Sequence, residues 1–246
     1  MTITNNMITR IPMYWQYQIL SRFRQTAFKI ISPNERAVLL NILDTFTPDE
    51  IFVDVGAFLG WYSELALQEG ITTVAFEPNV QSFNMLFKNL SKYNALSITI
   101  NKAISNTNGL TNFYNASRLQ VSSLSEQWLI SKNRSTYKKT QIETVTLDSF
   151  FEHMTKLNIG MLKIDAEGSE IDIINGTMQL IKSGRIRNML IEKNEGEQEM
   201  FYMLSEYYNM FQVLPKQLIE KITLRDIRNV GNFDNGHNIL LTRKVN

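Results

Sequence analysis

The sequence contains no cysteine, which excludes disulfide bonds, thiolate metal sites and a cysteine nucleophile. Glycine and proline are sparse, at 11 and 5 residues, and we find neither an internal repeat nor a low-complexity tract. No run of about 18 apolar residues occurs, and the N-terminus lacks the apolar core and cleavage site of a signal peptide. We therefore expect neither a solenoid nor a transmembrane segment, and take the cytoplasm as the default location.

An excess of charge of one sign is also lacking, because 25 Lys and Arg residues face 24 Asp and Glu residues and the net charge is +1. Such a chain has no overall field that would gather nucleic acid, so we expect no nucleic-acid partner. Apolar residues make up 43% of the 246 residues, enough for the core of one domain of ordinary enzyme size. Intrinsic disorder of the whole chain is not expected.

The first 34 residues contain no acidic residue but carry the basic side chains of Arg10, Arg22, Arg24 and Lys29. Apolar residues recur at helical spacing over residues 11–30, which predicts an amphipathic helix. Its basic face could make peripheral contact with an anionic membrane or could simply be solvated. A second helix is predicted for residues 35–46, so we divide the chain into an N-terminal helical segment at 1–46 and a main domain at 47–246.

From residue 51 onward, short apolar runs alternate with longer segments of helical periodicity. The runs predict buried strands at residues 51–55, 72–76, 98–104, 161–164 and 189–191. The segments between them predict helices at residues 61–68, 83–93, 147–154 and 171–181. Buried strands joined by helices are parallel, with right-handed crossovers, so we predict a doubly wound α/β sheet.

Two stretches interrupt this alternation. Residues 105–145 combine short β-like pieces with a polar loop that carries Lys132, Arg134, Lys138 and Lys139. Loops of that length in a compact domain are usually functional or disordered. Residues 211–214 and 238–242 are predicted to be two final strands, which could pair as an antiparallel edge of the sheet.

Glycines and acids follow the first two strands, where ligands of open α/β sheets bind. Asp54 is followed by Gly56 and Gly60, which permit a sharp turn and the close approach of a ligand to the backbone. Glu77 follows the second strand, where a carboxylate can accept hydrogen bonds from both hydroxyls of a ribose. This pair of loops indicates a nucleoside-containing cofactor. A nicotinamide cofactor would suit Glu77 too, but the GxGxxG motif is missing.

Acidic residues also follow the strands predicted at residues 161–164 and 189–191. Asp165 and Glu167 come directly after a buried strand, and acid clusters at strand ends are rarely structural. Glu170 is more simply explained as an acid in the first turn of a helix. Glu192 follows the next strand, and with Asp165 and Asn194 it could bind Mg²⁺ or instead hydrogen-bond the substrate. We expect no metal.

Four motifs resemble those of the FkbM-type methyltransferases, which use S-adenosylmethionine to methylate hydroxyl groups. They are VDVGAFLGWYS (53–63), AFEPN (75–79), VTLDSF (145–150) and LKIDAEGSE (162–170), of which the last is the most specific. The resemblance extends from about residue 51 to residue 244. It implies a Rossmann-like class I methyltransferase fold with a mostly parallel seven-stranded sheet and an antiparallel last strand. Residues 105–145 fall where family members vary, so the resemblance does not identify the acceptor.

The resemblance also assigns the cofactor contacts. The methionine part would lie on the first loop, the ribose on Glu77 and the adenine beside the end of the third strand, with Asp165 nearest the reacting methyl group. The expected cofactor-binding residues are Asp54, Gly56, Ala57, Gly60, Tyr62, Glu77, Pro78, Asn79, Ile104, Ser105 and Asp165.

The candidate catalytic residues are Asp165, Glu192 and His237. A hydroxyl group is a poor nucleophile until its proton is removed, and Asp165 is the first candidate for that base. His237 precedes an antiparallel last strand and so lies on the same side of the sheet, whereas His153 lies at the far side. We therefore predict an S-adenosylmethionine-dependent O-methyltransferase acting on a glycan or a small natural product. The alternatives are a nicotinamide-dependent oxidoreductase and a non-catalytic binding module.

Overall fold

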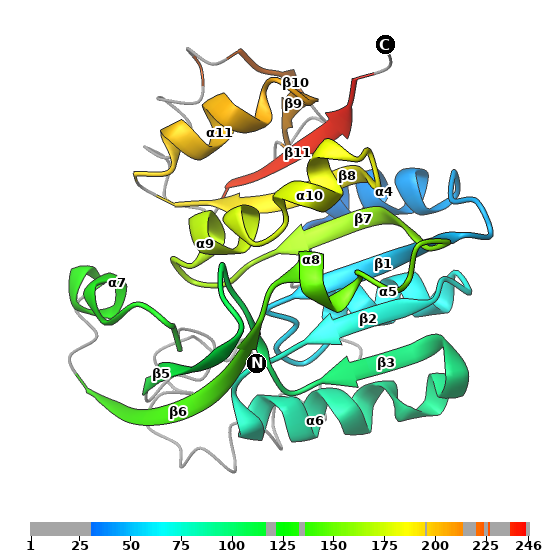
Figure 1. Ribbon diagram of the computed structural model, residues 1–246. Helices are drawn as coiled ribbons and strands as arrows, with labels where there is room; N and C mark the ends of the chain where they lie inside the picture. The colour runs from blue at the N-terminus through cyan, green and yellow to red at the C-terminus, as the bar shows by residue number, and fades with distance from the viewer. Residues whose placement is uncertain are drawn as a thin grey trace, which may run out of the picture.

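The computed structural model describes residues 31–116, 122–132, 136–194, 196–213, 220–223, 226 and 237–244. The amphipathic helix predicted for residues 11–30, and Arg134, lie outside these ranges. Figure 1 shows a central twisted sheet with helices on both faces and a smaller sheet beside one end of it. Within the described ranges, no helix combines the length and the apolar character needed to cross a membrane.

The central sheet contains five parallel strands and an antiparallel edge. Its order is β10 (Glu220–Lys221), β9 (Tyr208–Gln212), β11 (His237–Arg243), β8 (Ile186–Lys193), β7 (Asn158–Ile164), β1 (Glu50–Val55), β2 (Thr73–Phe76) and β3 (Ser97–Ile100). Strands β8, β7, β1, β2 and β3 are parallel, whereas β11 runs antiparallel to both β8 and β9. The predicted doubly wound, mostly parallel sheet is thereby confirmed, with the two-residue β10 added outside its seven longer strands.

The helices cover the two faces of this sheet. Apolar residues of α8 (Leu147–Phe150), α9 (Glu170–Asn175), α10 (Met178–Lys182) and α11 (Gln198–Leu204) form one core cluster with the strands. On the opposite face lie α4 (Pro33–Leu43), α5 (Trp61–Gln68) and α6 (Val80–Leu90), followed by the 3₁₀ helix η1 (Ser91–Leu96). Strands β1, β2 and β7 are buried along nearly their whole length, which explains why their sequences are continuous apolar runs.

Residues 105–145, which we call the insertion, fold largely into a smaller sheet. Strand β5 (Gly109–Ala116) pairs antiparallel with β6 (Tyr137–Val145), and β4 (Ala103–Ile104) joins β6 in parallel. Helix α7 (Glu126–Ser131) lies between β5 and β6 in the chain. The β-like pieces noticed in the sequence are therefore parts of one long hairpin.

Two predicted elements are each divided in the structure. The strand expected at residues 98–104 splits into β3 and β4, because the Asn101 amide donates to the carbonyl groups of Glu77 and Pro78 and draws the chain out of the main sheet. The helix expected at residues 171–181 splits into α9 and α10. Its second half has a cap of its own, since the Asp148 carboxylate accepts from the backbone N–H groups of Gln179 and Leu180.

Candidate active site

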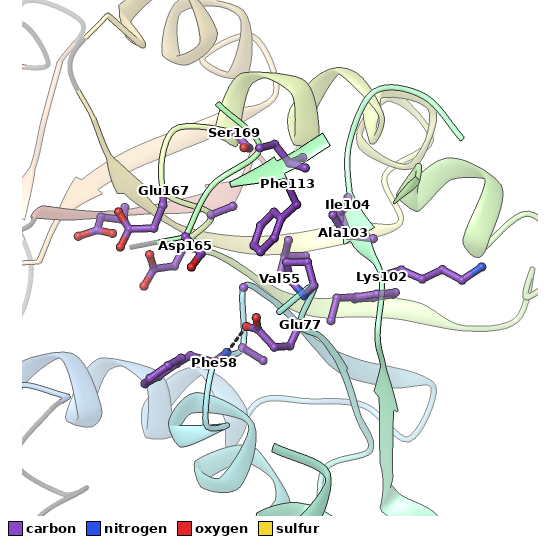
Figure 2. Close-up of a pocket in the computed structure, with 18 of the residues that line it drawn as sticks. Val55, Phe58, Glu77, Lys102, Ala103, Ile104, Phe113, Asp165, Glu167 and Ser169 are labelled. Atoms are coloured by element: carbon purple, nitrogen blue, oxygen red, sulfur yellow. Dashed lines mark hydrogen bonds between the residues drawn. The ribbon is translucent and has the colours of Figure 1, made fainter. Parts of the chain in front are cut away.

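A pocket of about 330 Å³ opens at the carboxyl ends of β1, β2 and β7. Figure 2 shows Asp165 and Glu167 at one end, Lys102, Ala103 and Ile104 at the other, and Glu77 between them. The expected cofactor-binding residues that line it are Gly56, Ala57, Tyr62, Glu77, Pro78, Ile104 and Asp165. The structure places the other expected ones behind the wall: Asp54, Gly60, Asn79 and Ser105.

Asp54 supports the first loop from below. Its side chain is 1% exposed, and its carboxylate accepts from the backbone N–H and the hydroxyl of Ser63, at 3.2 and 2.6 Å. Burial raises the pKa of Asp54 to about 6. Gly56 lets the loop after β1 lie directly against the loop after β7. A Cβ atom at Gly56 would lie only 1.8 Å from the carbonyl oxygen of Asp165, and the φ of this residue is +77°, which favours glycine.

Gly60, Asn79 and Ser105 shape the surroundings of the pocket. Gly60 precedes α5 with a φ of +87°, and a Cβ atom there would lie 2.6 Å from a methyl group of Leu86. The Asn79 side chain caps α6 by accepting from the backbone N–H groups of Gln81 and Ser82. The Ser105 N–H bonds to the carbonyl of Val145, which joins the end of β4 to β6. These three residues therefore position the loops from outside the pocket.

Glu77 is held in place by two backbone hydrogen bonds. One carboxylate oxygen accepts from the Phe58 N–H and the other from the Asn79 N–H, both at 2.8 Å, and Figure 2 marks the first. The side chain is 6% exposed. Burial raises the pKa of Glu77 to about 7, although both hydrogen bonds oppose this shift. Each oxygen keeps a further lone pair for a ligand.

The end of the pocket beyond Glu77 is largely apolar. This end is lined by Phe76 from β2, by Ala103 and Ile104 from β4, and by Phe113 from β5 of the insertion. Lys102 also lies here, with its ammonium group paired to Glu143 at 2.7 Å. Sequence reasoning missed Phe113, because only the folded hairpin brings β5 over the strand ends.

The opposite end carries three carboxyl groups, from Asp165, Glu167 and Glu192, whose oxygens lie within 4.8 Å of one another. The ammonium of Lys163 lies 3.3 Å from an Asp165 oxygen. Burial alone would raise the pKa of Asp165, but Lys163 and a hydrogen bond with Glu192 hold it below its usual value. The Asp165 charge and burial raise the pKa of Glu192 to about 9. At neutral pH, Glu192 therefore carries a proton and Asp165 does not.

Lys163 is itself enclosed, at 1% exposure. Its ammonium lies 4.8 Å from the centre of the Tyr62 ring, close enough for a cation–π contact. The Tyr62 hydroxyl donates to Glu35 on α4, and Asn238 on β11 donates to the same oxygen, both at 2.7 Å. Sequence reasoning overlooked Lys163 and Glu35, although Lys163 stands inside the motif that ends at Glu170.

The insertion closes over the turn that follows β7. Glu167 has a φ of +52°, uncommon for a residue with a side chain, and its carbonyl accepts from the Ser123 hydroxyl at 2.7 Å. Trp128 of α7 packs on Gly168, where a Cβ atom would lie 2.3 Å from the indole ring. Burial, followed by the charge of Asp165, raises the pKa of Glu167 to about 8.

The backbones of the two histidines lie at opposite ends of the sheet strands, as the sequence predicted. His237 begins β11, and its backbone pairs with that of Lys193, next to Glu192. The side chain of His237 lies outside the described part of the structure. His153 is exposed and lies between α8 and the start of β7, at the amino end of that strand.

Asn194 is, with Asp165 and Glu192, one of the candidate Mg²⁺ ligands in the sequence. Its backbone N–H bonds to Glu197. The carboxyl groups gathered at the pocket are those of Asp165, Glu167 and Glu192.

The model of the FkbM methyltransferase domain matches residues 54–221. The chain belongs to the FkbM methyltransferase family. It is an S-adenosylmethionine-dependent methyltransferase, which removes the nicotinamide-dependent oxidoreductase and the non-catalytic module from consideration. Comparison with curated proteins gave no match.

Several solved structures are similar to this FkbM methyltransferase at low sequence identity. Precorrin-6y C5,15-methyltransferase from Geobacter metallireducens is 14% identical, with 86% of this chain and 88% of that chain covered and a TM-score of 0.45. An rRNA methylase from Streptococcus thermophilus is 10% identical, with 84% and 94% covered and a TM-score of 0.46. The human methyltransferase 10 domain containing protein is 13% identical, with 86% and 80% covered and a TM-score of 0.47.

Proposed function

We propose that this methyltransferase transfers the methyl group to a hydroxyl of a glycan or a small natural product. The observation that carries the proposal is the pair of carboxyl groups from Asp165 and Glu192 at one end of the pocket. A carboxylate held by a protonated neighbour and an ammonium group is a defined acceptor for the proton that a hydroxyl must lose.

The residues of the pocket fit S-adenosylmethionine along its length. Glu77 offers both carboxylate oxygens to the ribose hydroxyls, and the apolar end around Ile104 accommodates the adenine. The loop at Gly56 and Ala57 lines the pocket, so the methionine part would lie against it, with the methyl group nearest Asp165. When bound, the cofactor supplies a methyl group that its sulfonium has already activated.

The chain's own residues then align the acceptor and take its proton. The carboxylate of Asp165 accepts the hydroxyl proton as the oxygen loses electron density to the incoming carbon. A base with a low pKa suffices for this step, because a methylated oxygen that still carries its proton is a far stronger acid than a carboxylic acid. General-base assistance of this kind contributes about 10²- to 10⁴-fold, and alignment contributes further. His237 is the alternative base on the same side of the sheet.

The charge of the pocket favours an uncharged acceptor over nucleic acid. Among the described residues that line the pocket, Lys102 alone is basic, and its ammonium is paired with Glu143. A phosphate placed beside the ionised carboxylate of Asp165 would meet repulsion at short range. The peripheral membrane contact expected of residues 11–30 lies outside the described part of the structure. A cytoplasmic location stays our expectation from the sequence.

The test is methyl transfer from labelled S-adenosylmethionine to extracted glycans, lipids, RNA and small metabolites, followed by mass spectrometry of the labelled product. The proposal expects label on oxygen in a glycan or small-metabolite fraction, and label there formed at least about tenfold more slowly with Asp165→Asn. Label found only on RNA, or on nitrogen, would contradict it.

A further inference from the structure

Two buried glutamates stand behind the acids of the pocket. Glu170 follows Asp165, and Glu197 follows Glu192, at the same separation in the sequence. Neither Glu170 nor Glu197 is among the described residues that line the pocket. They are 0% and 3% exposed, and burying a carboxyl group is costly unless it has hydrogen-bonding partners. The partners of these two groups therefore indicate what they do.

Glu170 closes the turn that carries Asp165 and Glu167. One of its oxygens accepts from the backbone N–H of Ala166 and the other from that of Gly168, both at 3.0 Å. Glu167 has a positive φ angle of +52°, which is unfavourable for a residue with a side chain, so this turn needs support from its surroundings. Both oxygens of Glu170 thus serve as acceptors for N–H groups of the turn.

Glu197 joins the next loop to this turn. One of its oxygens accepts from the backbone N–H of Asn194 at 2.7 Å, which holds the loop after β8. Its carboxyl group is also hydrogen-bonded to Glu170. Since Glu170 already accepts at both oxygens, the shared proton belongs to Glu197. Burial, and then the proximity of Glu170, raises the pKa of Glu197 to about 8, in agreement with this arrangement.

The loops after β7 and β8 are thus joined by two pairs of carboxyl groups. The outer pair, Asp165 and Glu192, faces the pocket, and the inner pair, Glu170 and Glu197, is enclosed beneath it. We propose that Glu170 and Glu197 are positioning residues, which hold the two loops together so that Asp165 and Glu192 meet at the reacting end of the pocket. Displacing catalytic groups by about 1 Å can cost a hundredfold in rate.

The inner pair is chemically asymmetric, and this gives a sharp test. In Glu197→Gln, the amide N–H can donate to Glu170 and the amide oxygen can accept from Asn194, so every hydrogen bond has a replacement. In Glu170→Gln, the amide nitrogen cannot accept, so the N–H of Ala166 or of Gly168 loses its partner. Glu197→Leu removes both bonds at similar volume. Glu199→Gln, at an exposed acid in the first turn of α11, the helix that begins directly after Glu197, is the matched control.

We expect Glu197→Gln and Glu199→Gln to keep kcat within about threefold of the wild type. Glu170→Gln and Glu197→Leu should lose about tenfold or more, by the loss of buried hydrogen bonds and of alignment. The dissociation constant of S-adenosylhomocysteine should change by less than about threefold in all four variants, because the Glu77 end is untouched. A general loss of structure would instead lower cofactor affinity and kcat together.

The kcat values rest on the proposed function, so a second measurement is made independent of the acceptor. Amide hydrogen exchange at Ala166 or at Gly168, whichever N–H then faces the amide nitrogen, should be faster by about tenfold in Glu170→Gln, and exchange at both should be unchanged in Glu197→Gln. If no hydroxyl acceptor is found, the proposed function fails while this exchange still decides the role of the pair. Wild-type exchange in Glu170→Gln would overturn the inference. So would equal losses in Glu197→Gln and Glu197→Leu, a comparison that holds even if Glu170→Gln does not fold.

Discussion

The carboxylate of Glu77 should determine how strongly the enzyme binds the ribose of its cofactor. Its two oxygens each accept one backbone N–H at 2.8 Å, which leaves one lone pair on each for a ribose hydroxyl. Glu77→Gln keeps the shape but replaces one acceptor by a donor and removes the charge. A hydrogen bond to a charged group contributes about 1.5–3 kcal/mol, so the dissociation constant should rise about 10- to 140-fold.

The same residue predicts a pH dependence of binding. The pKa of Glu77 in the free protein is raised to about 7, and the ribose hydroxyls bind the ionised form. Binding therefore lowers this pKa, and below pH 7 a proton must leave before the ligand is held. Affinity should fall as the pH drops below about 7, by up to tenfold per unit, and should level off above it. Glu77→Gln has no proton to release, so its affinity should not follow this curve.

Adenosine is the best probe, because it contains the ribose and lacks the methionine part that would lie beside the other acids. Calorimetry between about pH 5.5 and 8.5, in buffers of different ionisation enthalpy, gives both the affinity and the protons released. Glu69→Gln, at an exposed acid after α5, is the matched control. An adenosine affinity that is independent of pH in the wild type, or unaltered in Glu77→Gln, would refute the assignment of the ribose to Glu77.

Three further predictions concern the acid end of the pocket. Asp165→Asn should lower turnover at least about tenfold while cofactor affinity is largely kept. Glu192→Gln should lower turnover less, because its amide still donates to Asp165. Steady-state kinetics of the two variants tests both expectations. Chelators should leave activity unchanged, because the Lys163 ammonium already contacts Asp165; a loss restored by Mg²⁺ would show instead that the acids bind a metal. The pKa values of Glu167 and Glu197 are raised from 4.5 to about 8, so their contribution to the stability of the cofactor-free protein is complete below about pH 4.5 and is lost as the pH rises to about 8. The melting temperature should therefore fall as the pH rises towards 8 and level off above it; a melting temperature that rises between about pH 7 and 8 would contradict the raised values.

The fold was largely predictable because its strands are buried on both faces. A parallel strand covered on both sides must be apolar throughout, so β1, β2 and β7 stand out in the sequence. The acids that follow such strands then mark the edge where ligands bind. What the pattern could not give is the direction of each side chain. Asp54 lies in β1 and faces Ser63, whereas the next residue, Val55, lines the pocket, because successive side chains of a strand point to opposite faces.

The insertion shows a second limit of prediction from sequence. Its contacts with the pocket come from residues without a chemical signature of their own: Phe113 closes the apolar end, Ser123 holds Glu167, and Trp128 packs on Gly168. Each of these contacts depends on how a long hairpin returns to the strand ends. Local periodicity carries no information about such a return.

Lys163 explains how the acid end of the pocket can exist at all. A partly buried carboxylate such as Asp165, whose side chain is 36% exposed, is stabilised by a compensating charge and by hydrogen-bond donors, and the ammonium at 3.3 Å supplies both. The ammonium in turn is fully enclosed in β7, where it depends on Asp165 and on the face of the Tyr62 ring. Glu192 adds a donor without adding charge, since its pKa is raised to about 9. The end of the strand can therefore present an ionised Asp165 to the pocket because the strand interior, which looks like an apolar run with one misplaced lysine, carries the opposite charge.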